Sequence, residues 1–140
     1  MKIIVILCLV LLVSCSQEPE VVTGPFVFKN GITYDQTTNE PITGIVESFH
    51  ENGRLYFRQN YINGKRDGLW ETFYENGQLL ERENYKDGEL DGLDEWFYPN
   101  GQLWERRNYK DGEYNGLWEF FDEEGNLTKT KTYRNGERVE

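Results

Sequence analysis

A repeat of 24 residues is the feature that most constrains how this chain can fold. A glycine opens each copy, and the copies follow one another without insertion at Gly44, Gly68, Gly92 and Gly116. With each glycine counted as the first place, the fourth place is always glutamate, the sixth phenylalanine, the twelfth leucine and the eighteenth tyrosine. Two more glycines recur at the tenth and twenty-first places. A fixed period of this kind predicts a stack of equivalent supersecondary units, each in contact only with its neighbours.

Each copy contains two short strand-like segments and two turns. The first segment, "LWETFY" in the second copy, is rich in aromatic and other strand-forming residues, and the second segment follows the first turn. Chained hairpins of this kind predict an all-β fold, an elongated antiparallel meander of β-hairpin repeats in a single layer or ribbon. About ten strands spaced by about 4.8 Å would make a ribbon on the order of 45 Å long.

The glycine at the tenth place fixes the register of each hairpin. Its usual neighbour is asparagine, and Asn-Gly suits a two-residue type I′ turn. Pro99 in the third copy, and a glutamate before glycine in the fourth, instead favour a type I turn followed by a left-handed glycine in a bulge. The bulged turn predicts that Phe73 pairs with Leu79. The type I′ alternative would pair Glu71 with Arg82, and we prefer the bulge because solvated ion pairs contribute under about 1 kcal/mol each.

The N-terminus is typical of a secretory signal. Residues 1–14 hold one lysine and an apolar run, and "LVSC" resembles the bacterial lipobox, which implies cleavage before Cys15 and lipid attachment there. The alternative is ordinary secretion with a free thiol. We therefore divide the chain into a lipoprotein signal peptide (1–14), a lipidated N-terminus and tether (15–25), a capping hairpin or degenerate repeat (26–43) and four repeats (44–140).

The composition argues against several classes of function. A formal net charge of −10 would repel nucleic acid. His50 is the single histidine, and with Ser48 it has no neighbour that would orient a base, so we expect no catalytic residues and no enzyme activity. "DGELDG" begins like a calcium loop but has Tyr98 where an EF-hand needs glutamate, so we expect no metal site. No cofactor is predicted.

The stretches "GLWETFYENGQLLERENYKDGELDG", "GLDEWFYPNGQLWERRNYKDGEYNG" and "GLWEFFDEEGNLTKTKTYRNGE" resemble the MORN-repeat variant family, including YwqK-type antitoxin repeat proteins. The resemblance covers roughly residues 26–140. It implies a sheet of β-hairpin repeats that serves as an interaction module, and the antitoxin label implies a partner toxin. The aromatic hairpins also resemble choline- and glucan-binding cell-wall repeats, which implies a glycan ligand as an alternative.

The places that never change between copies are expected to build the turns and the packed face, so the places where the copies disagree are the candidate contact residues. The third, fifth and thirteenth places vary and carry all four tryptophans, three of them in the two middle copies. Exposed aromatic surface often marks a contact site, although such a face can also pack within the ribbon or dimerise. The candidate partner-binding residues are Trp70, Asp94, Trp96, Trp104, Trp118 and Phe120.

Together these patterns predict a membrane-anchored, non-catalytic protein-interaction module. Its partners would be a protein and, through the covalent lipid on Cys15, a membrane. Ser16 follows Cys15 where aspartate would favour retention at the inner membrane, so we expect the cell envelope, and the outer membrane within it. An immunity or antitoxin lipoprotein and a cell-wall glycan-binding protein are the alternatives.

Overall fold

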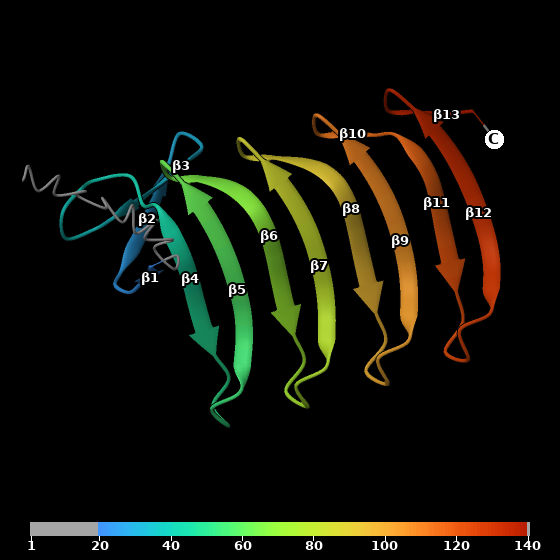
Figure 1. The fold of residues 1–140 in the computed structure, drawn as a ribbon, viewed down its shortest axis with the longest axis horizontal. Helices are drawn as coiled ribbons and strands as arrows, with labels where there is room; N and C mark the ends of the chain where they lie inside the picture. The colour runs from blue at the N-terminus through green and yellow to red at the C-terminus, as the bar shows by residue number, and fades with distance from the viewer. Residues whose placement is uncertain (1–19, 140) are drawn as a thin grey trace, which may run out of the picture.

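The computed structural model describes residues 20–139, and most of them form one row of neighbouring strands (Figure 1). The main sheet has eleven strands in the order β1-β4-β5-β6-β7-β8-β9-β11-β12-β13, with β10 also paired to β9. The predicted all-β meander is confirmed. The strands of this sheet are β1 (Val21–Val22), β4 (Gly44–Phe49), β5 (Leu55–Ile62), β6 (Lys65–Phe73), β7 (Leu79–Lys86), β8 (Glu89–Phe97), β9 (Leu103–Lys110), β10 (Glu113–Tyr114), β11 (Gly116–Phe121), β12 (Leu127–Arg134) and β13 (Glu137–Arg138).

The lower turns of Figure 1, which contain the tenth-place glycines, are the bulged turns predicted from Pro99. In the second copy the amide of Tyr74 donates to the carbonyl of Gln78 at 2.9 Å, Gly77 has a φ of 88°, and Phe73 pairs with Leu79. The pairing of Glu71 with Arg82 also exists, because the register shifts by one residue between Thr72 and Phe73. The two pairings treated as alternatives therefore coexist, and Leu80 is the extra residue of the bulge.

The upper turns, which contain the twenty-first-place glycines, are two-residue turns with both residues in the left-handed region. Asp87 and Gly88 have φ values of 51° and 94°, and they connect the paired residues Lys86 and Glu89. Asparagine or aspartate before glycine is the sequence that a type I′ turn requires. The second turn of each repeat thus has a chemistry different from the first, although both end in glycine.

Polar side chains join each lower turn to the next copy. The Tyr74 hydroxyl donates to the carbonyl of Phe97 at 2.8 Å, and Asn76 Nδ2 donates to the carbonyl of Pro99 at 3.0 Å. His50 occupies the place of Tyr74 in the first copy, and its Nε2 lies 2.8 Å from the carbonyl of Phe73. His50 is therefore part of the contact between copies.

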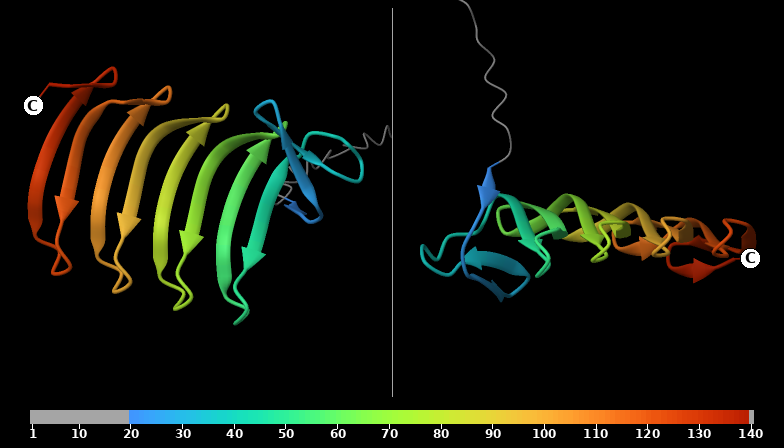
Figure 2. Two further views of the ribbon diagram at one scale, coloured as in Figure 1. Left: turned by 180° about the vertical axis from the view of Figure 1, so that it is seen from behind. Right: turned by 90° about the horizontal axis from the view of Figure 1, so that it is seen from below.

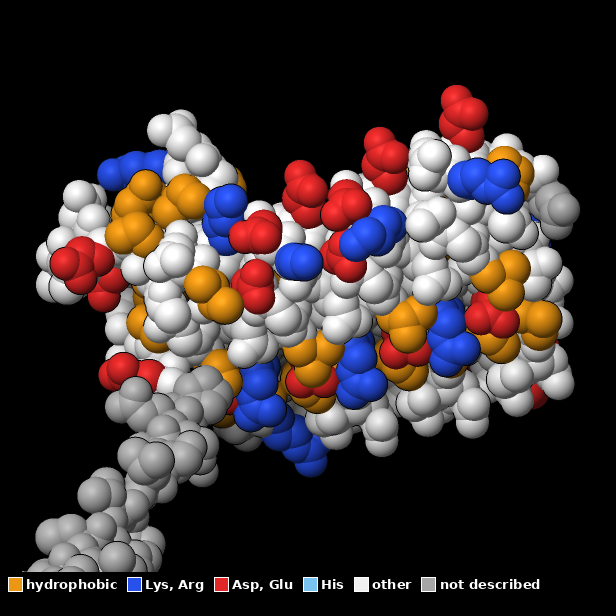
Figure 3. Space-filling model, turned by 45° about the horizontal axis from the view of Figure 1, so that its top comes forward, with side chains coloured by type: hydrophobic (Ala, Val, Ile, Leu, Met, Phe, Trp, Pro, Cys, Tyr) orange, Lys and Arg blue, Asp and Glu red, His pale blue; other side chains and the backbone are white. Residues whose placement is uncertain are grey.

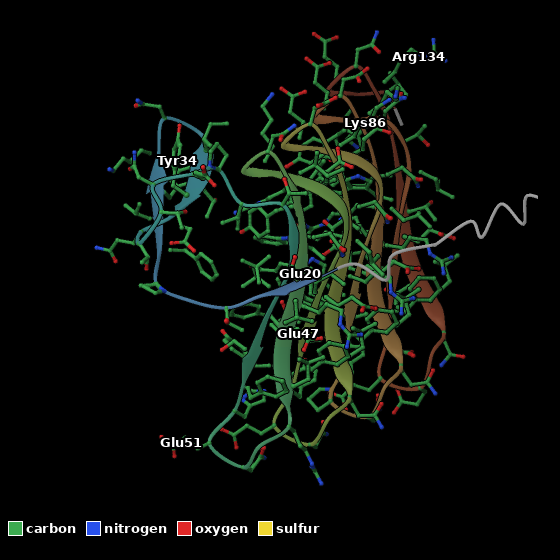
Figure 4. All side chains as sticks on the ribbon, turned by 60° about the vertical axis from the view of Figure 1, so that its left-hand side comes forward. Glu20, Tyr34, Glu47, Glu51, Lys86 and Arg134 are labelled. Atoms are coloured by element: carbon green, nitrogen blue, oxygen red, sulfur yellow. The ribbon has the colours of Figure 1, made fainter. Side chains whose placement is uncertain are left out.

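The strands bend at the glycine that opens each repeat. Gly92 has a φ of 118°, a Cβ there would lie 3.3 Å from Cβ of Asn84, and Asn84 Nδ2 donates to the carbonyl of Leu93 at 2.8 Å. Residues four apart in a straight strand are about 13 Å apart, yet the rings of Tyr114 and Trp118 have centroids 4.4 Å apart. Figure 4 shows the strands arching at their upper ends, toward the hairpin that carries Tyr34.

The bend gives the sheet an inner face and an outer face. Seen from below, the sheet is a thin single layer (Figure 2, right). On the outer face, glutamates and arginines alternate across the strands with apolar side chains between them (Figure 3), and Arg58, Arg82 and Arg106 each pair with a glutamate. Phe49, one of the invariant phenylalanines of this face, is 57% exposed. The prediction that the invariant residues make the packed face is wrong for this phenylalanine, whereas the invariant Tyr85 is buried on the inner face, which the arching strands close.

The N-terminal part of the described chain covers one end of the sheet. β2 (Phe26–Lys29) and β3 (Ile32–Asp35) form a separate hairpin within the predicted capping segment, and Thr33 N donates to the carbonyl of Gly64 at 2.8 Å. β1 lies within the segment predicted as a tether, but it pairs in parallel with β4. The tether prediction is therefore wrong for Val21 and Val22, whose backbone extends the sheet by one short strand.

Candidate binding surface on the inner face

The inner face brings the third and sixteenth places of all four repeats into one row across the sheet. Trp70 and Asp94, at the third place, each pair with the sixteenth-place residue on both sides, because the strands are antiparallel and in fixed register. A second row, from the fifth and fourteenth places, runs beside it. The first row consists of Val46, Gln59, Trp70, Glu83, Asp94, Arg107, Trp118 and Lys131, and the second of Ser48, Phe57, Thr72, Glu81, Trp96, Glu105, Phe120 and Lys129.

Three carboxyl groups meet at the middle of the two rows. Glu81 and Glu83 on β7 and Asp94 on β8 each place an oxygen within 4.8 Å of the others. Asp94 is 2% exposed, whereas the two glutamates are partly buried. Burial of like charges this close disfavours ionisation, so the cluster can hold a proton or a positively charged group.

The pKa values of the cluster follow from this geometry. Burial, together with the nearby charges of Glu83 and Asp94, raises the pKa of Glu81 to about 7. Burial also raises the pKa of Asp94 to about 6, although the Arg107 guanidinium acts to lower it. Burial raises the pKa of Glu83 as well, while a hydrogen bond from Tyr85 acts to lower it. The cluster therefore titrates nearer to neutrality than ordinary carboxyl groups do.

Arg107 binds the carboxylates on the C-terminal side of the cluster. Its Nη2 lies 2.6 Å from Glu105 Oε2 and its Nη1 lies 3.4 Å from Asp94 Oδ2. Burial alone would lower the pKa of Arg107, but the hydrogen bond and charge of Glu105 and the charge of Asp94 raise it above its ordinary value. The guanidinium also lies 5.2 Å from the ring centroid of Trp118. Arg107 is thus a permanent cation whose strongest contact is with Glu105, which is 3% exposed.

Arg66 lies on the opposite side of the cluster, at the start of β6. Its guanidinium stacks 3.8 Å above the ring centroid of Trp70, and its Nη1 donates to the hydroxyl of Tyr85 at 2.8 Å. The Tyr85 hydroxyl in turn donates to Glu83 Oε1 at 3.1 Å. Burial raises the pKa of Tyr85 to about 12, which keeps this hydroxyl protonated. Arg66 therefore reaches Glu83 only through a tyrosine.

The remaining aromatic candidates lie beside and beyond the cluster. The rings of Trp96 and Trp104 have centroids 6.2 Å apart in an edge-to-face arrangement, and Trp104 is 43% exposed because it is the extra residue of its bulge. The ring centroid of Phe120 lies 6.5 Å from that of Trp118, and Lys131 Nζ lies 4.9 Å from the Phe120 centroid. Trp118 is only 8% exposed. Trp104 is thus open to a partner, and Trp118 is packed by its own neighbours.

Unpartnered polar atoms are concentrated on the inner face. Among the described residues, the buried side-chain atoms that lack a hydrogen-bond partner all belong to this face. Buried polar groups are nearly always paired in folded proteins, so these enclosed atoms are a cost to the fold that falls on the inner face. The atoms are Trp70 Nε1, Asp94 Oδ1, Trp96 Nε1, Arg107 Nε and Trp118 Nε1.

The six candidate residues predicted from the sequence do lie on one face. The acidic cluster, to which Asp94 belongs, and Arg107 lie among them, and the sequence reasoning missed Glu81, Glu83, Glu105 and Arg107. The repeat did contain a signal for these four residues, because the fourteenth and sixteenth places also vary between copies. Cys15, the predicted lipid attachment residue, lies outside the described residues.

A single-layer sheet of chained hairpins, with two turn types alternating along it, defines the class of β-hairpin repeat proteins. The family model described as "MORN repeat variant" matches residues 42–63, 66–87, 90–111 and 114–135, so the chain belongs to the MORN repeat variant family. A comparison with curated proteins finds no match. Within residues 20–139 there is no helix with the length and apolar character needed to cross a membrane.

Two solved structures are similar over part of their length. Both are of TarM: a crystal structure of a point mutant of S. aureus TarM in complex with fondaparinux, alpha-GlcNAc-glycerol and UDP, and a crystal structure of TarM. Each is 17% identical with a TM-score of 0.37, and the match covers 81% and 82% of the present chain. The chain spans 20% of the length of each TarM chain. At this TM-score the likeness does not bear on the activity of the present chain.

Proposed function

We propose that this protein is a lipid-anchored, non-catalytic interaction module that binds a protein partner on its inner face. The observation that carries the proposal is the exposed ring of Trp104, in edge-to-face contact with Trp96, on the face where the repeats differ most in sequence. A scaffold alone needs the same residues in every copy. Residues that differ from copy to copy, with exposed aromatic rings among them, supply a surface that can distinguish one partner from another.

The anchor is the lipid expected on Cys15. Only four residues separate Cys15 from Glu20, and Val21 and Val22 pair with β4, so a lipid at Cys15 would hold this end of the sheet close to the membrane. We propose the cell envelope, and the outer membrane within it, as the location. Replacing Cys15 with serine should release the protein into the soluble fraction, and continued membrane fractionation would count against the anchor.

The partner surface is tested by alanine at Trp96 and Trp104. Both variants should lose the partner identified by cross-linking and mass spectrometry of the native lipoprotein in its own envelope, while the far-ultraviolet circular dichroism stays unchanged. Phe49→Ala is the matched control, because Phe49 is an exposed aromatic residue on the outer face. Equal loss of cross-linking in the control would remove the inner face from the proposal. Loss of folding would assign the tryptophans to the core.

The partner of such a module can be a toxin, in which case the protein is an immunity lipoprotein. Expression of the protein with its cross-linked partner would then relieve the partner's toxicity, and the Trp104→Ala variant would not relieve it. A glycan is the second candidate ligand, because an exposed aromatic ring such as that of Trp104 suits the apolar face of a sugar. Sedimentation of the protein with purified cell-wall glycan tests this candidate directly.

A further inference from the structure

We infer that a pocket at the N-terminal end of the inner face binds the C-terminal residue of the protein partner, with aromatic rings around its side chain and Arg66 on its free carboxylate. This inference rests on the proposed function and names the part of the partner that is bound. The pocket lies between the hairpin of β2 and β3 and the start of β6, and its volume is about 400 Å³. The side chains that line it include Phe26, Phe28, Thr33, Tyr61 and Arg66.

The two sides of the pocket are held together by backbone hydrogen bonds. Thr33 N donates to the carbonyl of Gly64 at 2.8 Å, Gly64 N donates to the carbonyl of Ile42 at 2.7 Å, and Ile42 N donates to the carbonyl of Thr33 at 3.1 Å. A Cβ on Gly64 would lie 2.6 Å from the carbonyl oxygen of Thr33, so the two backbones are in direct contact. The hairpin, which carries Tyr34, thus stands at a fixed place beside the upper ends of the strands (Figure 4). A ligand that enters a preformed pocket does not have to order its walls.

The hairpin gives the pocket an aromatic wall. Phe26 and Phe28 are two residues apart on β2, and Thr33 pairs with Phe28 from β3, so the three side chains share one face of the hairpin. Phe28 is 71% exposed, the highest value among the large hydrophobic residues that the structure describes. Most of its ring is therefore left uncovered by the chain, and an apolar group of a ligand would cover it.

Arg66 gives the pocket its positive charge. It pairs with Tyr61 across the turn between β5 and β6, so the two side chains lie next to each other on the inner face. The guanidinium is held in place by the ring of Trp70, 3.8 Å away, and by one hydrogen bond to the hydroxyl of Tyr85. Within residues 20–139 Arg66 forms no ion pair, and its remaining N–H groups donate to no protein atom. A guanidinium that is fixed in this way matches the geometry of a carboxylate.

A C-terminal residue is the part of a protein that carries an apolar side chain and a carboxylate on the same carbon atom. An internal aspartate or glutamate would pair with Arg66 but leave the aromatic wall uncovered, and an internal apolar side chain would leave the cation unpaired. Capture of a C-terminal carboxylate is a recurring mode of peptide recognition. The last strand, β13, lies at the far end of the sheet (Figure 1), so the chain does not fill the pocket with its own C-terminus. A second copy does not fit either, because its C-terminal residue is Glu140.

The test uses the full-length protein in detergent and three tripeptides. They are acetyl-Gly-Gly-Phe with a free carboxylate, the same peptide with an amidated end, and acetyl-Gly-Gly-Gly with a free carboxylate. We expect calorimetry to show that the first peptide binds about tenfold or more tightly than either of the others, because one lacks the charge and the other lacks the ring. Amide chemical shifts should change at the glycines that line the pocket, Gly31, Gly64 and Gly88.

Two substitutions assign the charge and the aromatic wall. Arg66→Gln should bind the free acid and the amide of acetyl-Gly-Gly-Phe equally, because the partner of the carboxylate is gone. Phe28→Ala should bind the free acid about tenfold more weakly and still fold, since most of this ring is exposed. Arg82→Gln and Phe49→Ala remove the same groups from the outer face and should bind as the unchanged protein does.

The results that would overturn the pocket are distinct from those that would overturn the proposed function. Equal binding of the acid and the amide by the unchanged protein, or equal loss in the outer-face variants, would overturn the pocket. Removal of the C-terminal residue of the cross-linked partner should weaken its binding about tenfold, and unchanged binding would overturn this residue as the occupant. If the acid peptide fails to bind while Trp96→Ala and Trp104→Ala still lose the partner, the inner face remains the contact surface and the pocket is wrong.

Discussion

Replacing Glu81 with glutamine should stabilise the protein, although it removes a charged residue. The pKa of Glu81 is raised from 4.5 to about 7, so the folded chain binds a proton between these pH values more tightly than the unfolded chain does. Stability therefore falls as the pH rises through this window. Glutamine has no proton to lose, so the variant escapes the decline.

The size of the effect follows from the shift. A rise in pKa of this size lowers the free energy of unfolding by at most about 3 kcal/mol above pH 8. Because the side chain is only partly buried, solvent screening lowers the expected gain to about 1–2 kcal/mol. At pH 4.5, where the folded chain holds the proton, the variant and the unchanged protein should differ by less than about 0.5 kcal/mol.

The measurement is urea unfolding followed by circular dichroism at pH 4.5 and pH 8. Glu123→Gln, with the same change in charge on an exposed turn, should shift the free energy of unfolding by less than about 0.5 kcal/mol at both pH values. A Glu81→Gln variant that is less stable at pH 8, or a difference that does not change between the two pH values, would refute the account of the cluster given above.

Two further substitutions test how the faces and the repeats are held together. Arg107→Met leaves two buried carboxylates without their cation, so it should cost about 3–5 kcal/mol at pH 8 in urea unfolding and less at pH 5, whereas Arg82→Met on the outer face should cost under about 1 kcal/mol. A similar cost for both would contradict the difference between the faces. Tyr74→Phe removes only the hydrogen bond to the carbonyl of Phe97. It should lower the free energy of unfolding by about 0.5–1.5 kcal/mol, seen as a lower thermal midpoint. An unchanged midpoint would show that this link does not stabilise the stack.

The repeat unit and its turns could be predicted from the sequence because local chemistry determines them. Pro99 and the left-handed glycines require the bulged turn, and the alternation of strand and turn residues fixes the meander. The coexistence of the Phe73–Leu79 and Glu71–Arg82 pairs was missed because a bulge moves the register within a strand. The β1 strand was missed because two residues carry no periodicity.

The wrong choice of packed face has a different cause. Invariance between copies was interpreted as burial, but the invariant glycine at the first place bends each strand, and this bend encloses the variable side chains instead. The bend places Arg66, at the start of β6, over the ring of Trp70 on the same strand. The acidic cluster was missed for the same reason. Glu81 and Glu83 lie on β7 and Asp94 lies on β8, so their proximity can be predicted only when the register of neighbouring hairpins is known.

The energetics separate the two kinds of residue on this sheet. On the outer face each Arg–Glu pair is partly solvated and each copy repeats its neighbour, so the loss of any one pair changes little. On the inner face Glu81, Glu83 and Asp94 weaken the fold at neutral pH, as their raised pKa values show. The first and last copies have Phe57 and Lys129 at the fourteenth place, so a glutamate there is not needed for the repeat fold. The carboxyl groups of the inner face therefore lower the stability of the folded chain at neutral pH, and for that reason a Glu81→Gln protein that is more stable than the unchanged protein at pH 8 is the result to expect.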